Sequence, residues 1–352
     1  MDLPFTFDKI AAGSSILGRS EEIGTIVATL EKGGRGLAVY GEARSGKETV
    51  VMEAIEQVRA RKRNLILCQL DLFNIRSFED FCTLWRARMK ECAVEVNRGA
   101  LLPFEINIED IAVGKIFDLP GIIANEAGAQ MVVYIKDFQN LLRAEDENFR
   151  LEDLDRTWSR QRQVNYLLTG SFVNAMKSIF VERRCFYGMC RTLELQPLGR
   201  REVCEYIRTT FLRFGRVIEM EEAMAIYEIA AGNMWYVKQL CSICYAMPAG
   251  YVNRKIVNQA RDTILSVHVP RFKQMLLDLT GNQISLLRAI SDGVQKLSSA
   301  EMVERYRLNS SANVARVKDA LQKKEVITLD GEDNARIIDP LFAYWLRNYY
   351  FV

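Results

Sequence analysis

The chain has 352 residues, a formal net charge of +2 and 49% hydrophobic residues, which suits two or three domains with substantial cores. A nearly neutral chain is not a general binder of polyanions, so any nucleic-acid contact must come from a local patch. The opening MDLPFTFDKI lacks the apolar segment of a signal peptide, and no apolar run approaches the roughly 20 residues that cross a membrane. We therefore expect a soluble, cytoplasmic protein without membrane contact.

The eight cysteines lie mostly inside apolar runs, which is typical of small buried residues in a reducing compartment. Only Cys241 and Cys244 have the spacing of a metal-binding pair. No second pair accompanies them, and the sole histidine, His268, has no partner at a ligand spacing. We predict no metal site.

A helix is predicted from Ser20, and a strand, a loop and a second helix follow within residues 36–51. Further helical segments include 77–96 and 107–127. Four more strands are predicted, at 64–71, 130–135, 164–168 and 191–195, of which the first two are expected to be buried. Strands that alternate with helices predict an α/β fold with a parallel, doubly wound sheet.

The pattern changes twice after Pro197. Helical segments with no strand among them predict an all-helical lid, at 200–214, 220–231, 234–246 and 253–266. Three short helices and a β-hairpin that turns at Asp330 and Gly331 then predict a winged helix. The predicted domains are 1–196, 197–275 and 276–352.

The stretch GLAVYGEARSGKETVV at 36–51 reads as strand, phosphate loop and helix. Gly41 and Gly46 permit close backbone approach to a phosphate, the following helix offers its N-terminus, and Lys47 can reach the β- and γ-phosphates. The motif G-x-x-x-x-G-K-[ST] ends in a hydroxyl that holds Mg²⁺, and here that position is Glu48. Thr49 comes one residue later, and a helix rotation of about 100° predicts that it faces away from the metal position.

The chain resembles the archaeal-type predicted ATPases, a branch of the AAA+/STAND P-loop NTPases with a C-terminal winged helix. The resemblance is carried by Leu17-Gly18-Arg19, the loop at 41–49, KDFQN at 136–140, Thr169-Gly170-Ser171, Gly232-Asn233 and Asp339-Pro340-Leu341-Phe342. It implies that ATP or ADP binds. The nucleotide-binding residues implied are Gly18, Arg19, Gly41, Glu42, Ala43, Arg44, Ser45, Gly46, Lys47, Glu48, Thr49 and Lys136.

The departures from that family fall on the hydrolysis machinery. The family's metal-binding Asp aligns with Lys136, its catalytic Glu with Asp137 and its loop hydroxyl with Glu48. We hypothesise that Glu48 and Lys136 form an ion pair where Mg²⁺ would sit. Alternatively, Lys136 turns toward the phosphates and replaces Mg²⁺ together with Lys47, or hydrolysis proceeds with Asp137 holding the metal through water, so the binding of Mg²⁺ is left open.

The candidate catalytic residues are Asp137, Thr169 and Ser171. Asp137 is one methylene shorter than Glu, and the resemblance makes Thr169 or Ser171 a sensor of the γ-phosphate, although a hydroxyl at a strand end also caps helices. Arg183 and Arg184 are candidates for a finger that acts on a neighbouring subunit, which would require a homo-oligomer; solvated arginines are the alternative.

Basic and polar residues of the winged helix suit contact with duplex DNA. The DNA-binding candidates are Asn313, Arg316, Lys323, Lys324 and Arg336. Acidic residues nearby dilute the positive field, so a protein-docking role is the alternative. Two functions follow: a nucleotide-dependent switch with weak or no hydrolysis, coupled to the winged helix, or a non-hydrolysing adaptor or DNA-binding regulator that keeps the fold as a scaffold.

Overall fold

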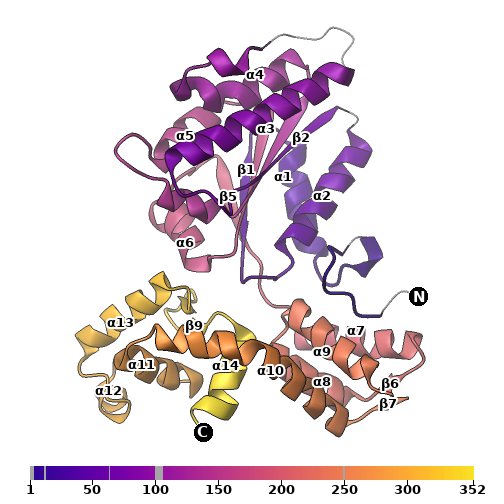
Figure 1. Ribbon diagram of the computed structural model, residues 1–352, viewed down its shortest axis with the longest axis vertical. Coiled ribbons are helices and arrows are strands. Elements are labelled where there is room, and N and C mark those ends of the chain that lie inside the picture. The colour runs from indigo at the N-terminus through magenta and orange to yellow at the C-terminus, as the bar shows by residue number, and fades with distance from the viewer. Residues whose placement is uncertain (1–3, 12, 63, 100–105, 249) are drawn as a thin grey trace. The chain divides into compact units, whose positions relative to one another are not determined.

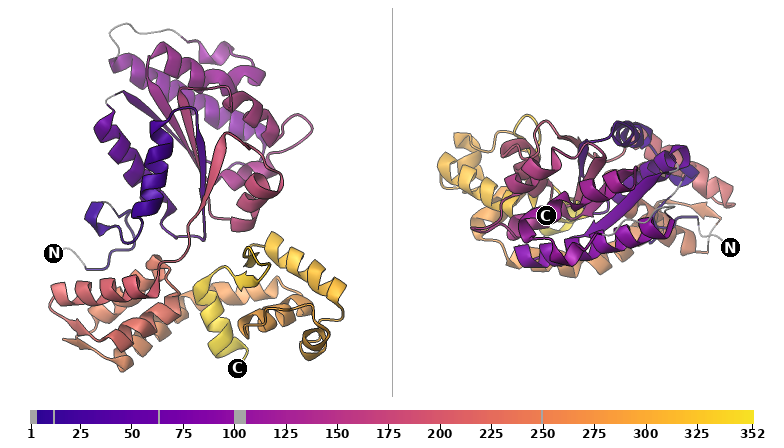
Figure 2. Two further views of the ribbon diagram at one scale, coloured as in Figure 1. Left: turned by 180° about the vertical axis from the view of Figure 1, so that it is seen from behind. Right: turned by 90° about the horizontal axis from the view of Figure 1, so that it is seen from above.

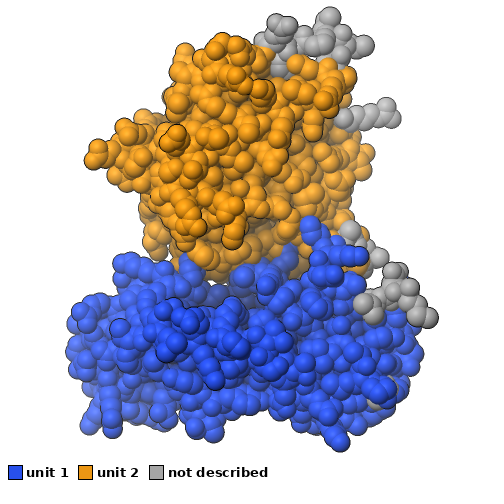
Figure 3. All heavy atoms as spheres, viewed as in Figure 1, with its two compact units in different colours: residues 1–10, 42–46, 196–352 blue, residues 11–41, 47–195 orange. Residues whose placement is uncertain are grey.

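The computed structural model describes residues 4–11, 13–62, 64–99, 106–248 and 250–352. The chain divides into two compact units, coloured in Figure 3. Unit 2 comprises Ala11–Gly41 and Lys47–Leu195, and unit 1 comprises Met1–Ile10, Glu42–Gly46 and Gln196–Val352. No helix among the described residues is long and apolar enough to cross a membrane.

Unit 2 is built on a five-stranded parallel sheet with the strand order β2-β3-β4-β1-β5. The strands are β1 Gly36–Tyr40, β2 Leu65–Asp71, β3 Gln130–Lys136, β4 Val164–Gly170 and β5 Cys190–Glu194. The predicted α/β fold and all five predicted strands are confirmed. The carboxyl ends of β1, β3 and β4 meet at one edge of the sheet, which is where open α/β sheets bind ligands.

Helices cover both faces of this sheet (Figures 1 and 2). The α-helices of unit 2 are α1 Ser20–Glu31, α2 Lys47–Arg61, α3 Phe78–Gly99, α4 Leu119–Glu126, α5 Leu151–Trp158 and α6 Val173–Lys177. Side chains alternate along each strand, so Val132 and Tyr134 of β3 pack with α1 and α2, whereas Met131, Val133 and Ile135 pack with the helices on the opposite face. Burial on both faces explains the continuous apolar run of β3.

The segment at 107–127, predicted as a helix with a break, folds differently. Two 3₁₀ turns, Ile108–Asp110 and Val113–Asp118, precede the short helix α4, and Pro120 sits in the first turn of α4. Proline lacks a backbone N–H and is tolerated where that donor has no helical partner, so Pro120 starts a helix instead of interrupting one. The other single-turn elements of unit 2 are Gly13–Ser15, Phe138–Arg143 and the π-helical turn Ser178–Glu182.

The first part of unit 1 after Gln196 is helical, as predicted. Its helices are α7 Arg200–Arg213, α8 Met220–Ala230, α9 Met234–Ala246 and α10 Arg254–Leu277. The structure adds a parallel pair of two-residue strands, β6 Val217–Ile218 and β7 Tyr251–Val252, where the sequence predicted none. Helix α10 also runs past the predicted end at residue 266 and contains Pro270, because the buried side chains of Phe272 and Leu276 continue its apolar face.

The C-terminal part of unit 1 has the predicted winged-helix order. Its elements are α11 Gly281–Ser291, α12 Ala300–Arg305, α13 Ser311–Lys323, β8 Ile327–Leu329, β9 Ala335–Ile337, α14 Pro340–Trp345 and a π-helical turn Leu346–Tyr350. Strands β8 and β9 form the antiparallel wing, with Thr328 opposite Arg336. Ser310 caps α13 by accepting from the Asn313 backbone N–H, and Asp339 caps α14 by accepting from two backbone N–H groups.

Candidate nucleotide-binding site

The loop between β1 and α2 has the conformation that the phosphate-binding motif requires. Gly46 adopts φ +91°, a conformation that other residues rarely adopt, and Arg44 adopts φ +63°. Lys47 is buried at the start of α2, and its Nζ donates to the Gly41 carbonyl oxygen at 3.0 Å. Left-handed residues at Arg44 and Gly46, directly before the N-terminus of α2, are the backbone features of loops that bind anions through successive N–H groups.

The two positions that normally hold the metal carry opposite charges and contact each other. Lys136, the last residue of β3, forms an ion pair with Glu48 in the first turn of α2. The Lys136 side chain is 28% exposed and the Glu48 side chain 42% exposed, so water reaches the pair. The sequence-based hypothesis that these two side chains face each other is confirmed.

Asp137 follows Lys136 in a strained backbone conformation. It has φ +52° and ψ +42°, the left-handed region, and it precedes the turn Phe138–Arg143. Its carboxylate accepts from Gln139 Nε2 at 3.2 Å. The left-handed residue redirects the chain sharply after β3 and places Gln139 in a buried position.

Gln139 of the KDFQN motif lies next to Gly170 of the TGS motif, a contact that the sequence analysis did not predict. Gly170 ends β4, and a Cβ on Gly170 would lie 2.5 Å from Gln139 Oε1 and 2.4 Å from Met176 Sδ. Any larger residue here would require the Gln139 and Met176 side chains to move. Gln139 Oε1 is buried and has no hydrogen-bond partner among the described residues. The KDFQN and TGS motifs therefore pack against each other at the sheet edge.

The two hydroxyl candidates after β4 differ in their surroundings. Thr169 is buried, lies beside Val39 of β1, and donates from Oγ1 to the Ile135 carbonyl oxygen at 3.4 Å. Ser171 is half-buried directly after the strand. In this structure Thr169 bridges two strands, and Ser171 is the more accessible hydroxyl.

Two further predicted groups are engaged within unit 2. Arg19 is buried at the start of α1 and its Nη1 lies 2.6 Å from Glu22 Oε1, after Gly18 at φ +61°. The proposed finger residue Arg183 donates to Glu145 at 2.7 Å and to Glu152 at 2.9 Å. Arg183 is thus part of an ion-pair cluster of its own unit.

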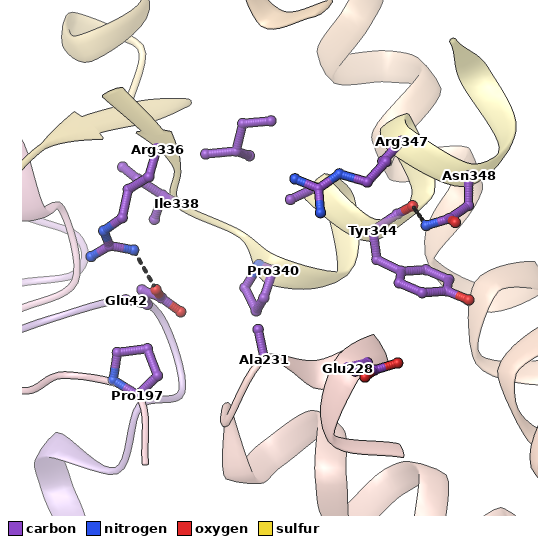
Figure 4. Close-up of a pocket in the computed structure, with 12 residues that line it drawn as sticks. Glu42, Pro197, Glu228, Ala231, Arg336, Ile338, Pro340, Tyr344, Arg347 and Asn348 are labelled. Carbon is purple, nitrogen blue, oxygen red and sulfur yellow. Dashed lines mark hydrogen bonds and ion pairs between the residues drawn. The ribbon is translucent and has the colours of Figure 1, made fainter. Parts of the chain in front are cut away.

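Glu42 and Arg44 of the loop contact other parts of unit 1. Glu42 is only 6% exposed, and its Oε1 accepts from Arg336 Nη1 of β9 at 2.9 Å (Figure 4). The Asn233 side chain also bonds to Glu42. Burial raises the pKa of Glu42 above its ordinary value, while the charge of Arg336 opposes that rise. The Arg44 guanidinium carbon lies 3.6 Å from the centre of the Trp235 ring, a cation–π contact.

A cavity of about 320 Å³ adjoins the Glu42–Arg336 pair. Its lining comes from Pro197, from Glu228 and Ala231 at the end of α8, and from residues of β9 and α14, with Arg347 at the far side (Figure 4). Arg347 donates from Nε to the Ser291 carbonyl oxygen at 2.9 Å and does not contact Glu42 in this view.

Four of the DNA-binding candidates lie on or directly after α13, and Arg336 lies on β9. Arg316 and Lys323 are exposed on α13, where Arg316 donates to Asn313 Oδ1 at 2.9 Å and Lys323 pairs with Asp319 at 2.8 Å. Lys324 donates to the Asp278 carbonyl oxygen. Arg336 instead contacts Glu42. The remaining predicted loop residues lie at the surface or half-buried: Ala43, Ser45 and Thr49.

No group of three or more His, Cys, Asp or Glu side chains in the described part of the chain is arranged to hold a metal ion. Cys241 and Cys244 are both buried in α9. At the phosphate loop, the positions of the motif's metal ligands carry Glu48 and Lys136, and a carboxylate paired with an ammonium is a poor ligand set for a divalent cation.

Solved structures share this fold. The chain superposes on the Walker-type ATPase paby2304 of Pyrococcus abyssi with a TM-score of 0.73 and 15% identity, covering 98% of this chain and 99% of that one. The Aeropyrum pernix ORC2 protein, solved in ADPNP–ADP complexes, gives a TM-score of 0.62 at 14% identity, with 97% and 95% covered. The Cdc6p protein of Pyrobaculum aerophilum gives 0.51 at 11% identity, with 98% and 95% covered.

A family model described as "Probable winged helix domain" matches residues 270–348. No curated protein sequence matches the chain. The fold is therefore the AAA+-like P-loop ATPase fold, with helices after the sheet and a winged helix at the C-terminus.

Proposed function

We propose that this chain, built on the fold of the P-loop ATPases, is a nucleotide-dependent switch that binds ATP or ADP without requiring Mg²⁺ and hydrolyses ATP slowly or not at all. Nucleotide occupancy is coupled to the winged helix. The observation that carries the proposal is the ion pair between Glu48 and Lys136, which lies at both metal-holding positions next to an intact phosphate loop.

The residues present fit a polyphosphate. Gly46 has the required backbone conformation, α2 presents its N-terminus, and Lys47 lies beneath the loop. These groups bind phosphate through backbone N–H donors and one cation, and none of them depends on a metal. Binding of adenine nucleotide is further supported by the ORC2 structures, which hold ADPNP and ADP.

The metal positions support binding without Mg²⁺. A hydroxyl and a carboxylate together with Mg²⁺ contribute net positive charge in a standard site. Glu48 and Lys136 cancel each other, and Lys47 is the cation that the loop motif supplies to the phosphates. When Lys136 engages the phosphates instead of Glu48, its charge and that of Lys47 take the place of the metal.

Slow hydrolysis follows from Asp137. Its carboxylate is one methylene shorter than the glutamate that orients water in related sites, and it accepts a hydrogen bond from Gln139. Without a metal to neutralise the charge that develops on the phosphates, positioning alone supplies little acceleration. The site is therefore suited to holding a nucleotide.

The test is calorimetric titration of ATP and ADP with and without Mg²⁺, followed by a phosphate-release assay on the same protein. Binding that ignores Mg²⁺, with no release, supports the proposal; Mg²⁺-dependent binding with turnover contradicts it. The double change Glu48→Thr with Lys136→Asp should make binding dependent on Mg²⁺. The control Lys47→Ala should abolish the shift of the thermal midpoint that nucleotide produces.

A second candidate is an adaptor that uses the fold without nucleotide. It is favoured by the closed Glu48–Lys136 pair, because in that arrangement the Glu48 carboxylate repels a γ-phosphate. Titrations of both nucleotides that show no heat and no thermal shift would select this candidate.

For the winged helix we propose duplex DNA as the partner, because α13 exposes Arg316 and Lys323 on one helix. Both are offset by neighbouring acidic or polar groups, so the expected binding is weak and falls steeply with salt. A gel-shift titration of the wild type against Arg316→Gln with Lys323→Gln tests this. Retention of DNA by the double variant would indicate a protein-docking role for α13 instead.

A further inference from the structure

The Glu42 carboxylate is a buried negative charge in a loop whose proposed ligand is a polyanion. We propose that Arg336, on the wing strand β9, is a positioning residue for the phosphate loop: it neutralises Glu42 and thereby makes nucleotide binding depend on the winged helix. This inference rests on the proposed nucleotide-binding function and assigns to the wing a role apart from DNA contact.

The contacts of Glu42 define the pair. Its carboxylate is 6% exposed and lies 2.9 Å from Arg336 Nη1, and it also bonds to the Asn233 side chain. Asn233 caps α9 through the Trp235 and Tyr236 backbone N–H groups. One loop side chain is thus held both by the wing and by the first turn of a helix.

A second contact holds the same loop. The Arg44 guanidinium lies 3.6 Å above the Trp235 ring, and Trp235 in turn contacts His268 of α10, with ring centres 5.8 Å apart. The loop is therefore fixed by two side chains on either side of Ala43. Fixing both restricts the backbone whose N–H groups would bind phosphate, which lowers the ordering cost of binding.

The charge argument gives the direction of the effect. Burial already penalises the ionised form of Glu42 and Asp339 adds a negative charge nearby, while the charge and hydrogen bond of Arg336 and the hydrogen bond of Asn233 act in the opposite direction. Without Arg336, an ionised Glu42 would repel the phosphates. Its carboxylate would also move toward solvent, which would distort the loop. A change of one charge within a few ångströms of a bound anion is expected to alter affinity about tenfold.

Reciprocity then links the wing to the nucleotide. If the position of Arg336 changes the affinity for nucleotide by some factor, nucleotide changes the stability of the Arg336 contact by the same factor. Binding of a partner that draws β9 away from Glu42 would weaken nucleotide binding, and bound nucleotide would hold the wing against the loop.

The experiment uses the full chain and titrates ADP and ATP into four proteins: the wild type, Arg336→Met, Glu42→Gln and the double variant. Arg336→Met should weaken binding about tenfold, and the double variant should recover to within about threefold of the wild type, because it removes the unpaired charge. Arg347→Gln is the matched control, since Arg347 lines the same cavity without contacting Glu42, and it should bind nucleotide as the wild type does.

A pH series separates a charge effect from a general loss of structure. Among the described residues, the charged groups near Glu42 include Arg336 and Asp339. As pH falls, protonation of Glu42 should restore the affinity of Arg336→Met toward that of the wild type at the same pH. A variant that is merely distorted would show no such recovery.

Unchanged affinity in Arg336→Met, or failure of Glu42→Gln to rescue it, would overturn the inference. If the wild type binds no nucleotide, the proposed function fails instead, and a double-mutant cycle on the free energy of unfolding then decides whether Glu42 and Arg336 are coupled. A coupling free energy of zero in that cycle would overturn the inference independently of any ligand.

Discussion

Lys136 and Glu48 should have opposite effects on nucleotide binding although they form one ion pair. Lys136→Met removes a positive charge from the phosphate site and leaves the Glu48 carboxylate unpaired, so nucleotide should bind more weakly. Glu48→Gln removes the repelling carboxylate and releases Lys136, so binding in the absence of Mg²⁺ should tighten. If the ion pair had a purely structural role, both variants would be less stable than the wild type, and their nucleotide affinities would not change in opposite directions.

The magnitude follows from the exposure of the two side chains. A unit charge about 5 Å from a phosphate charge is worth about 3 kcal/mol at an effective dielectric constant near 20. Because the side chains are 28% and 42% exposed, salt and water screen part of this, and we expect about 1.5 kcal/mol, or about tenfold, in each direction. The free energy of unfolding should change by less than about 1 kcal/mol, as for other water-exposed ion pairs.

The assay is calorimetric titration of ADP without Mg²⁺, paired with urea unfolding of each variant. Lys90→Met is the matched control, because Lys90 of α3 forms an exposed ion pair at 2.5 Å with Glu109 of the turn Ile108–Asp110, outside the phosphate loop. Equal affinity of Lys136→Met and the wild type would refute the assignment of Lys136 to the phosphate site. Weaker binding by Glu48→Gln would refute the sign of the charge argument.

Two further predictions concern stability. Gly170→Ala should lower the free energy of unfolding by about 1–3 kcal/mol, because its Cβ would lie 2.4 Å from Met176 Sδ and 2.5 Å from Gln139 Oε1; urea unfolding with an unchanged midpoint would contradict this packing. Burial lowers the pKa of His268, the only histidine, so the unfolded chain binds more protons between the two pKa values and stability should fall as pH drops below about 6.5. In urea unfolding between pH 7.5 and 5.5, the free energy of unfolding of His268→Phe should depend less on pH than that of the wild type. The raised pKa of Glu42 affects the wild type and the variant equally, so the difference between their pH dependences reports on His268.

Much of unit 2 was predictable because its signals are local. The buried strands β1, β3 and β4 are short, mostly apolar runs, and the glycines and lysine of the phosphate loop stand at fixed spacing, so the sheet and the loop followed from sequence alone. The Glu48–Lys136 pair also followed, because the motif fixes where both residues stand although 88 positions separate them. This long-range contact was predicted from the known geometry of the motif and not from a local sequence pattern.

The contacts of the loop with unit 1 could not be predicted in this way. Glu42 and Arg336 are 294 positions apart, and no sequence motif predicts that these two residues are in contact. The two-residue strands β6 and β7 are too short to show alternation. Helix α10 crosses Pro270, where propensity predicts an end and the packing of Phe272 continues the helix.

The opposite charges of Glu48 and Lys136 also make substitutions at the two positions interdependent. Lys136→Asp alone would place two carboxylates face to face, and Glu48→Thr alone would leave Lys136 without its acidic partner and still without a metal ligand on the strand. Either single variant would lack the ligands for Mg²⁺ and would also have lost the ion pair. A hydroxyl at position 48 and a carboxylate at position 136 would therefore have to be introduced together for a metal site to form here.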